Sequence, residues 1–167
     1  GVLALTAALF IEQTLLRLST ASAMIHIIRG ERDRGKTRTM SEIFREAAGR
    51  GQAYGLVSRK IFDTGAPTGY EGLILTTGET FPIAFHYEHT PAGWDELDRL
   101  GPYSFSGRGF QKAESLLTPQ NISDKNPLFL DEIGPLELSG RGFYSIAAAI
   151  FGLKKDIYIT SRPSCVV

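Results

Sequence analysis

Residues 30–37 decide the fold, and they read Gly30-Glu31-Arg32-Asp33-Arg34-Gly35-Lys36-Thr37. They fit the pattern G-x-x-x-x-G-K-[ST] without a mismatch. The apolar run over residues 24–28 predicts a buried strand before them, and residues 37–48 predict a helix after them. A strand, this turn and a helix in that order predict a loop whose backbone N–H groups bind phosphate at the positive end of the helix. The alternative is a chance match in a glycine-containing turn.

Each part of this loop has an expected role. Lys36 is expected to reach the β- and γ-phosphates of a nucleotide, and the Thr37 hydroxyl to ligate Mg²⁺. The loop interior lacks glycine, so we expect Asp33 to adopt a positive φ, which aspartate tolerates better than most residues. Arg32 and Arg34 either point to solvent or add positive charge near the phosphates. The residues expected to bind the nucleotide are Gly30, Glu31, Arg32, Asp33, Arg34, Gly35, Lys36, Thr37 and Arg38.

A second motif supplies two carboxylates. Residues 128–130 read Leu-Phe-Leu and predict a core strand that leads into Asp131 and Glu132. Asp131 is expected to hold Mg²⁺ through water, as in other enzymes with a phosphate loop of this kind. Glu132 is then placed to orient or deprotonate an attacking water molecule. The alternative is a pair of acids that merely face solvent.

The remaining pattern alternates strands with helices, which predicts an α/β fold with a mostly parallel sheet and crossover helices. Residues 60–63 and 70–76 flank a segment rich in glycine and predict an added antiparallel hairpin. Residues 86–100 are polar and irregular, so we expect a mobile loop there. We expect a helix over residues 1–21 and one domain over residues 22–167. The other expected strands cover residues 54–58, 81–85, 103–105 and 157–160, and the other expected helices cover residues 109–117 and 143–151.

Residues 131–138 read Asp-Glu-Ile-Gly-Pro-Leu-Glu-Leu, which resembles the signature of a family of P-loop nucleoside-triphosphatases. That family includes the human cancer-related nucleoside-triphosphatase and its archaeal and bacterial relatives. Two further segments of the chain are similar to segments of the family. They are residues 55–59 with residues 69–71, and residues 101–105 with Phe110.

The resemblance covers residues 24–163 and implies slow, Mg²⁺-dependent hydrolysis of ATP, GTP and other nucleoside triphosphates to diphosphates. It also implies a three-layer, RecA-like P-loop fold that is related to nucleotide kinases. Glu137 matches a further family acid whose role the sequence does not assign. The chain departs from the family in its charged loop interior and at Arg38, where a second threonine is usual. We expect these departures to change the rate of hydrolysis and the affinity for nucleotide more than the ability to bind nucleotide at all.

Three arginines are candidates for the site. Arg59, Arg108 and Arg141 lie in or beside loop segments, and one of them is expected to supply positive charge to the transferring phosphoryl group. Arg59 and Arg108 are the better candidates because both lie in segments that resemble the family. With Lys36 and Glu132 they form the expected catalytic set. The plainer interpretation of each arginine is a solvated surface residue.

Imidazole and aromatic groups gather in the middle of the chain. His86 and His89, with Glu88 between them, offer three metal ligands, although a solvated loop is the plainer interpretation. Trp94 and Tyr103 offer rings that stack on a base. Trp94 is more simply explained as an anchor for its loop.

Charge and composition exclude some functions. The 167 residues carry 18 basic and 18 acidic side chains, so the net charge of zero gives no general attraction to nucleic acid. The apolar run over residues 2–11 is too short to span a membrane and lacks the preceding positive charge of a signal peptide. Cys165 is the only cysteine, which fits a reducing cytoplasm. The helix expected over residues 1–21 offers a surface for a protein partner or for self-association.

Three functions fit the sequence. The first is Mg²⁺-dependent hydrolysis of nucleoside triphosphates with broad base specificity, in which Glu132 positions water in line with the γ-phosphate. The second is a kinase that acts on a nucleotide or another small molecule, although no acceptor site is obvious in the sequence. The third is a nucleotide-responsive binding module with little turnover, which the charged loop interior and the apolar N-terminal run suggest.

Overall fold

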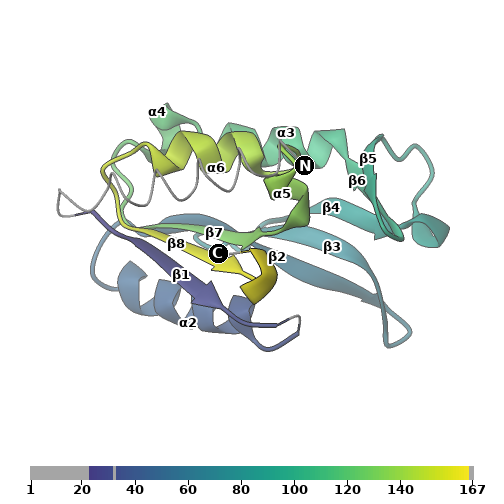
Figure 1. The fold of residues 1–167 in the computed structure, drawn as a ribbon, viewed down its shortest axis with the longest axis horizontal. Coiled ribbons are helices and arrows are strands. Elements are labelled where there is room, and N and C mark those ends of the chain that lie inside the picture. The colour runs from purple at the N-terminus through teal and green to yellow at the C-terminus, as the bar shows by residue number, and fades with distance from the viewer. Residues whose placement is uncertain (1–22, 32, 166–167) are drawn as a thin grey trace.

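In the part of the chain that the structure describes, eight strands form one sheet with helices on both of its faces (Figure 1). The computed structural model describes residues 23–31 and 33–165, so Arg32 and the helix expected over residues 1–21 lie outside the described residues. In chain order the elements are β1 (Ile25–Arg29), α2 (Lys36–Ala48), β2 (Tyr54–Asp63), β3 (Ala66–Ile74), β4 (Thr80–His86), η2 (Tyr87–His89), β5 (Glu96–Leu100), β6 (Tyr103–Ser106), α3 (Gly107–Leu116), α4 (Pro119–Ile122), β7 (Leu128–Ile133), α5 (Pro135–Leu138), α6 (Tyr144–Phe151), β8 (Ile157–Ser161) and η3 (Pro163–Cys165).

Four neighbouring strands form the parallel half of the sheet. β1, β8, β7 and β2 lie side by side and run in the same direction. β8 therefore separates β1, which leads into the phosphate loop, from β7, which carries Asp131 and Glu132. The antiparallel half continues from β2 with β3, β4, β6 and β5 in that order. The predicted α/β fold is confirmed, and its antiparallel part is larger than the single hairpin expected from the sequence.

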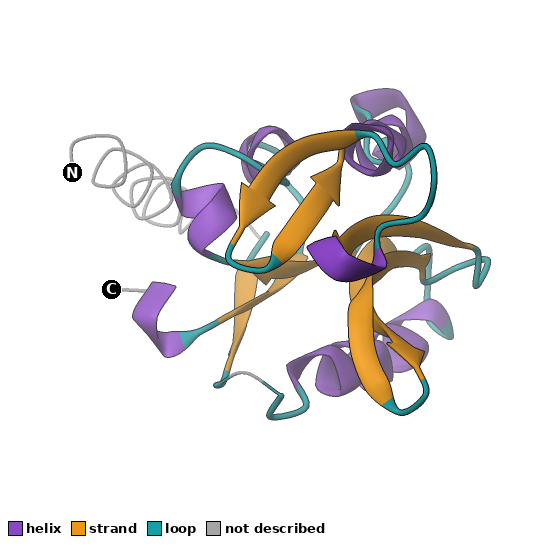
Figure 2. Cartoon of the chain, turned by 90° about the vertical axis from the view of Figure 1, so that its right-hand side faces the viewer, coloured by secondary structure: helices purple, strands orange, loops and turns teal. Residues whose placement is uncertain are grey.

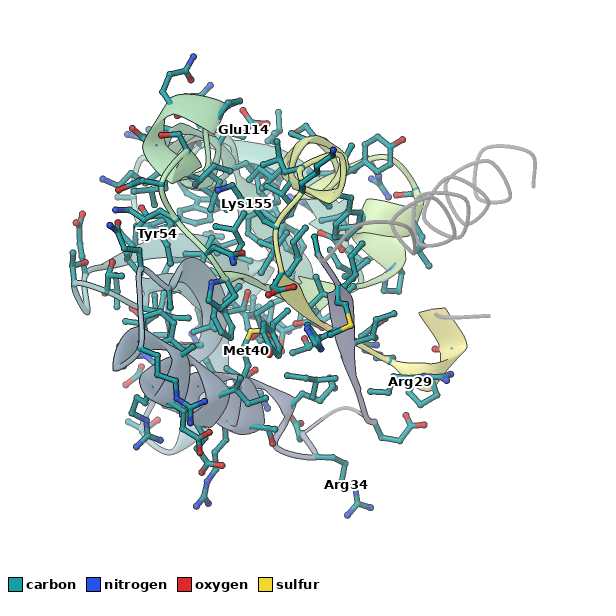
Figure 3. The ribbon with its side chains drawn as sticks, turned by 90° about the vertical axis from the view of Figure 1, so that its left-hand side faces the viewer. Arg29, Arg34, Met40, Tyr54, Glu114 and Lys155 are labelled. Carbon is teal, nitrogen blue, oxygen red and sulfur yellow. The ribbon has the colours of Figure 1, made fainter. Side chains whose placement is uncertain are left out.

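The helices form two outer layers. α2 lies on one face of the sheet, whereas α3, α4, α5 and α6 lie on the other (Figures 1 and 2). Crossover helices on a parallel sheet produce these three layers because each helix buries its apolar side against one face. Met40 on the buried side of α2 lies under the sheet, while Arg34, just before that helix, points away from the protein (Figure 3). In the described part of the chain, no helix is long and apolar enough to cross a membrane.

Alternating side chains on the central strands fill two cores, one on each face of the sheet. Leu56 and Leu130 belong to the larger core beneath α3, α5 and α6, whereas Val57 and Phe129 belong to the smaller core against α2. Successive residues of a strand point to opposite faces, so β2 and β7 bury side chains on both. The ring of Phe129 is fully buried and meets Phe44 of α2 edge-on, with ring centroids 5.4 Å apart. This contact fixes α2, and with it the phosphate loop, against β7.

A close approach of two strands positions the site. Gly55 of β2 pairs with Phe129 of β7, and a Cβ atom at Gly55 would lie 2.3 Å from the Phe129 carbonyl oxygen. Only glycine therefore lets the two strands lie this close together. The pairing brings the backbone N–H of Ser58, further along β2, to the carboxylate of Asp131 in β7.

Some segments differ from the sequence prediction. Residues 54–63 form one strand, because β2 continues without a break into its hairpin with β3. The loop predicted over residues 86–100 is wrong at its end, where β5 pairs with β6. β5 is an edge strand with mostly exposed side chains, so its sequence lacks the alternating apolar residues that reveal a strand. The one-turn helices α4 and α5 are too short to produce a helical pattern.

Candidate active site

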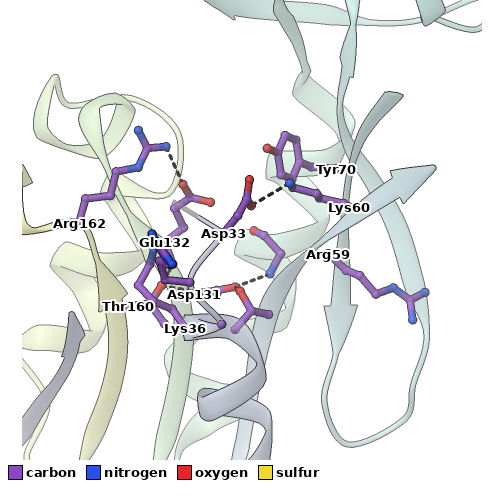
Figure 4. A pocket seen from close by; sticks show the side chains of 13 residues that line it. Asp33, Lys36, Arg59, Lys60, Tyr70, Asp131, Glu132, Thr160 and Arg162 are labelled. Carbon is purple, nitrogen blue, oxygen red and sulfur yellow. Dashed lines mark hydrogen bonds and ion pairs between the residues drawn. The ribbon is translucent and has the colours of Figure 1, made fainter. Parts of the chain in front are cut away.

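A cavity of about 460 Å³ lies where the carboxyl ends of β7 and β8 face the start of α2 (Figure 4). Carboxyl ends of neighbouring parallel strands meet at one edge of the sheet, which is where α/β proteins bind their ligands. The cavity brings together loop residues 33–37 and the side chains of Asp131 and Glu132. The two sequence motifs therefore form one site in space.

The phosphate loop adopts the backbone conformation that its sequence predicts. Gly35 has a φ of 81° ahead of α2, and Asp33 has a φ of 60°, the positive value expected for it. The Asp33 carboxylate forms an ion pair with Lys60 of β2, with 2.7 Å between Oδ1 and Nζ. This pair ties the charged interior of the loop to the sheet.

Lys36 folds back over the loop. Its ammonium group donates a hydrogen bond to the Glu31 carbonyl oxygen at 2.8 Å. An ammonium group has three N–H donors, so this bond leaves others for phosphate oxygens. At the start of the loop, the Gly30 N–H donates to the Ser161 carbonyl oxygen at 3.2 Å, which fixes the loop to the end of β8.

Asp131 is the buried centre of the site. The residue is 2% exposed, and its carboxylate accepts hydrogen bonds from three other segments of the chain. The Thr37 hydroxyl donates at 2.7 Å, the Ser58 backbone N–H donates at 3.1 Å, and the Thr160 hydroxyl completes the set. Burial raises the pKa of Asp131 above its usual value, while the bonds from Thr160, Thr37 and Ser58 act in the opposite direction. A cation bound at this carboxylate would favour its charged form.

Thr37 and Asp131 fit a magnesium ion. Mg²⁺ prefers oxygen ligands in octahedral geometry at about 2.1 Å, which places adjacent ligands roughly 3 Å apart. The Thr37 hydroxyl and Oδ2 of Asp131 are 2.7 Å apart, close to the spacing of two such ligands. The protein thus supplies two oxygens, and phosphate and water oxygens would complete the coordination shell.

Glu132 is held in a strained backbone conformation. Its φ is 61°, in the left-handed region that glutamate rarely adopts. The pairing of β7 with β8 shifts register between Leu130 and Ile133, so Asp131 and Glu132 form a bulge in the strand. The Glu132 N–H donates to the Thr160 hydroxyl at 2.9 Å, which holds this bulge in place. Strain of this kind concentrates where a side chain must be aimed at a ligand.

Arg162 contacts Glu132 within the cavity. It follows β8 directly, and its Nη2 donates to Oε1 of Glu132 at 3.1 Å (Figure 4). Its Nε is buried and has no hydrogen-bond partner among the residues that the structure describes. Leaving a buried donor unpaired is costly, and a phosphate oxygen in the cavity would satisfy it.

No motif marks Arg162 or Thr160, and neither was predicted from the sequence. The signal that would have found them is topological. Both lie at the carboxyl end of the last parallel strand, and such ends converge on the edge of the sheet where Asp131 and Glu132 lie.

Two arginines predicted for the site turn away from it. Arg59 lines the cavity, but its guanidinium pairs with Glu71 and points away from the carboxylates of β7 (Figure 4). Arg38 is exposed on α2 and pairs with Glu42 one turn further along that helix. Its side chain therefore points to solvent beside the loop.

Arg108 and Arg141 do not line the cavity. Arg108 lies in the first turn of α3, where its guanidinium contacts Asp95 and the Gly93 carbonyl oxygen. Arg141 pairs with Asp98 of β5. Arg108 lies in a segment that resembles the family in sequence. That segment forms β6 and the start of α3, and β6 lies near the edge of the sheet opposite β1 and the phosphate loop. The structure does not bring this predicted catalytic residue to the phosphate loop.

The alternative metal site at His86, Glu88 and His89 is not formed. Among the described residues, no group of three or more His, Cys, Asp or Glu side chains is arranged to hold a metal ion. His86 instead stacks on the ring of the next residue. Trp94 donates its indole N–H to the Ser104 hydroxyl at 2.9 Å, so it anchors its loop, as the plainer interpretation expected.

Glu137 has a structural role that the sequence did not reveal. It is 6% exposed, and its carboxylate accepts hydrogen bonds from the N–H groups of Gly134 at 2.9 Å and Phe143 at 3.1 Å. These bonds hold the turn between β7 and α6. Burial raises the pKa of Glu137 to about 7, although both backbone bonds act to lower it.

A loop carrying Lys36 and Thr37 that faces a carboxylate pair on a nearby parallel strand, β7, defines the class of P-loop nucleoside-triphosphate-binding proteins. The profile of a family described as NTPase matches residues 26–163, which is most of the chain. The chain therefore belongs to this family of nucleoside triphosphatases. The resemblance noted in the sequence is confirmed.

Two solved structures share the fold. One is a human cancer-related nucleoside triphosphatase, and the other is THEP1 from the hyperthermophile Aquifex aeolicus. Each is 21% identical to this chain with a TM-score of 0.61, and each likeness covers 84% of this chain. The matched part is 76% of the human protein chain and 77% of the THEP1 chain. No curated protein sequence matches the chain.

The positive φ of Glu132 predicts that glycine is more stable than alanine at this position. Glu132→Gly and Glu132→Ala both lose the ion pair with Arg162, so their difference isolates the backbone strain. We expect the glycine variant to have a free energy of unfolding about 1 kcal/mol higher, because left-handed backbone costs other residues about 1–2 kcal/mol. Urea unfolding measures both variants, and equal stability would contradict the strain.

The raised pKa of Glu137 predicts that stability falls as pH rises through the acid range. Its usual pKa is 4.5 and its folded value is about 7, so between these values the folded state binds more protons than the unfolded state. The free energy of unfolding then decreases by up to about 1.4 kcal/mol per pH unit across this interval and levels off above it.

Glu137→Gln removes this titration and serves as the matched control. We expect the free energy of unfolding of wild type, relative to that of the variant, to fall by up to about 3 kcal/mol from about pH 5 to about pH 8. Urea unfolding at several pH values measures it. A difference that stays constant with pH would show that Glu137 titrates alike in the folded and unfolded states.

Proposed function

We propose that the protein hydrolyses nucleoside triphosphates to diphosphates and phosphate in a Mg²⁺-dependent reaction, with broad base specificity. The observation that carries this proposal is the convergence of the phosphate loop, Asp131, Glu132 and Arg162 on one cavity. Membership of the NTPase family supports the class of reaction. The described residues that line the cavity are suited to bind phosphate groups, a cation and an attacking nucleophile. A site built around these groups supports low selectivity for the base of the nucleotide.

Positive groups hold the triphosphate. The N-terminal end of α2 and the loop N–H groups attract phosphate oxygens. Lys36 exchanges its bond to the Glu31 carbonyl oxygen for a bond to phosphate. Because the group that prepares the nucleophile must face the γ-phosphorus, the γ-phosphate lies towards Glu132. The nucleoside then lies at the opposite end of the phosphate chain, away from Glu132.

Glu132 prepares the nucleophile. Its carboxylate accepts a hydrogen bond from a water molecule and orients it towards the γ-phosphorus. The water oxygen forms the new P–O bond while the bond from the γ-phosphorus to the bridging oxygen breaks. The electron pair of the broken bond stays on the diphosphate, and the proton of the attacking water passes to Glu132.

Thr37 and Asp131 are the residues that would hold the Mg²⁺. When bound, the cation offsets the negative charge on the β- and γ-phosphate oxygens. The Thr160 hydroxyl and the Ser58 N–H orient the Asp131 carboxylate, as groups behind a metal ligand commonly do.

Arg162 couples substrate binding to the availability of the base. Without substrate its guanidinium pairs with Glu132. A γ-phosphate in the cavity offers oxygens to Nη2 and to the buried Nε, which lacks a partner in the described chain. When the guanidinium turns to phosphate, the Glu132 carboxylate becomes free to bind water. The charge-assisted bonds to phosphate also stabilise the transition state.

Two other parts of the proposal rest on the sequence. We place the protein in the cytoplasm because its one cysteine fits a reducing compartment. We assign residues 1–21, outside the described part, to contact with a protein partner or a second copy of the chain.

Phosphate release from ATP, GTP, CTP and UTP with Mg²⁺ tests the proposal. Lys36→Ala is expected to lose most affinity for nucleotide. Glu132→Gln is expected to keep its affinity and lose turnover, because an amide does not accept the proton. Arg162→Gln is expected to lower kcat by about 100-fold or more, since it removes donors to the transferring phosphoryl group.

Arg59→Gln is the matched control for Arg162→Gln, because Arg59 lines the same cavity but pairs with Glu71. We expect it to change kcat little. Wild-type protein that binds nucleotide yet releases no phosphate from any of the four substrates would overturn the proposal. Equal losses in the two arginine variants would show that only the overall positive charge matters.

A further inference from the structure

A second cavity adjoins the phosphate site. It has a volume of about 450 Å³ and shares lining residues with the first cavity. The shared residues are Ser58, Tyr70, Glu132 and Arg162. The ion pair between Glu132 and Arg162 therefore lies between the phosphate loop and a space of different character.

Several aromatic rings line the second cavity, which we call the aromatic cavity. Tyr103 and Phe105 come from β6, Phe110 comes from α3, and Phe143 precedes α6. Phe105 and Phe110 are stacked with centroids 5.9 Å apart, and Phe110 meets Phe143 edge-on at 5.3 Å. Flat apolar walls in a cavity of this size suit a planar ring system.

The charge of the aromatic cavity favours a neutral ligand. Arg162 is the only basic side chain among the described residues that line it, and Glu132 neutralises that charge. Glu137 also lines the cavity, and its two oxygens are bonded to backbone N–H groups. A phosphorylated ligand requires charge-assisted donors, which this lining does not offer in excess. An uncharged ring compound requires none.

The triphosphate does not fill both cavities. This inference rests on the proposed function, in which Glu132 faces the γ-phosphate and the nucleoside lies at the far end of the phosphate chain from Glu132. The aromatic cavity contains no residue of the phosphate loop and extends from Glu132 to the segment before α6. Its occupant is therefore not the base of the bound triphosphate. A molecule in it lies on the side from which a nucleophile approaches the γ-phosphorus.

We propose that the aromatic cavity binds a neutral planar alcohol, such as a nucleoside or an aromatic alcohol, whose hydroxyl group accepts the γ-phosphoryl group. The hydroxyl oxygen forms a bond to the γ-phosphorus, and the bond from that phosphorus to the bridging oxygen breaks. Its electron pair leaves with the diphosphate, and the hydroxyl proton passes to Glu132. The product is a phosphate monoester. Hydrolysis is the same displacement with water as the nucleophile.

Ligand-observed NMR tests occupancy of the cavity without any turnover. The sample contains the full chain, Mg²⁺ and an excess of the β,γ-imido analogue of ATP, which fills the phosphate site. The probes are adenosine, guanosine, cytidine, uridine and pyridoxine. We expect at least one probe to bind. Leu100 of β5 lines the cavity and is 39% exposed, so Leu100→Trp is expected to block it and to abolish that signal.

Leu97→Trp is the matched control. Leu97 lies on the same strand, is 67% exposed and does not line the cavity, so its variant is expected to keep the probe signal. Failure of every probe to bind wild type, or equal loss of signal in both tryptophan variants, would overturn the inference. Binding of the ATP analogue, measured in the same samples, tests the phosphate site separately.

Transfer is then measured with ATP labelled at the γ-phosphate and the probe that binds. We expect labelled phosphate monoester beside labelled inorganic phosphate, and no monoester from Leu100→Trp. Inorganic phosphate alone, with the probe bound, would overturn the acceptor role and leave hydrolysis standing. Absence of both products would instead contradict the proposed function.

Discussion

The buried carboxylate of Asp131 is the interaction on which the site depends. A carboxylate removed from water is strongly destabilising unless it is bonded, and Asp131 obtains its bonds from α2, β2 and β8. These bonds join the phosphate loop to three parallel strands of the sheet. The packing of Phe129 against α2 and the close approach at Gly55 bring those segments within reach. The hydrogen bonds then fix where the Thr37 hydroxyl lies.

The bulge at Glu132 follows from the same arrangement. Thr160 donates to Asp131 and accepts from the Glu132 N–H, so one hydroxyl holds both acidic residues in place. The two acids therefore serve different purposes although they are adjacent in sequence. Asp131 is enclosed beside the loop, whereas Glu132 faces Arg162 at the junction of two cavities. The strained φ of Glu132 is compensated by the packing around it, as is usual for side chains aimed at a ligand.

Much of the fold was predictable because its signals are local. The strand before the loop, α2 and the positive φ of Asp33 follow from apolar patterning and turn chemistry in adjacent residues. β5 was missed because an exposed edge strand carries no apolar alternation. Arg162 and Thr160 were missed because their relation to Glu132 exists only once β8 lies beside β7. Arg108 was assigned because its segment resembles the family, and its pairing with Asp95 keeps its guanidinium away from the phosphate loop.

We propose that the Thr37 hydroxyl and the Asp131 carboxylate form the metal-binding edge of a triphosphate site. The most direct test is a crystal structure of the chain with Mg²⁺ and a non-hydrolysable triphosphate. We expect Mg²⁺ on the Thr37 hydroxyl, with Asp131 bound to it directly or through water, and Arg162 turned from Glu132 to the γ-phosphate. A metal ion remote from both oxygens, or a γ-phosphate beyond the reach of Glu132, would contradict it.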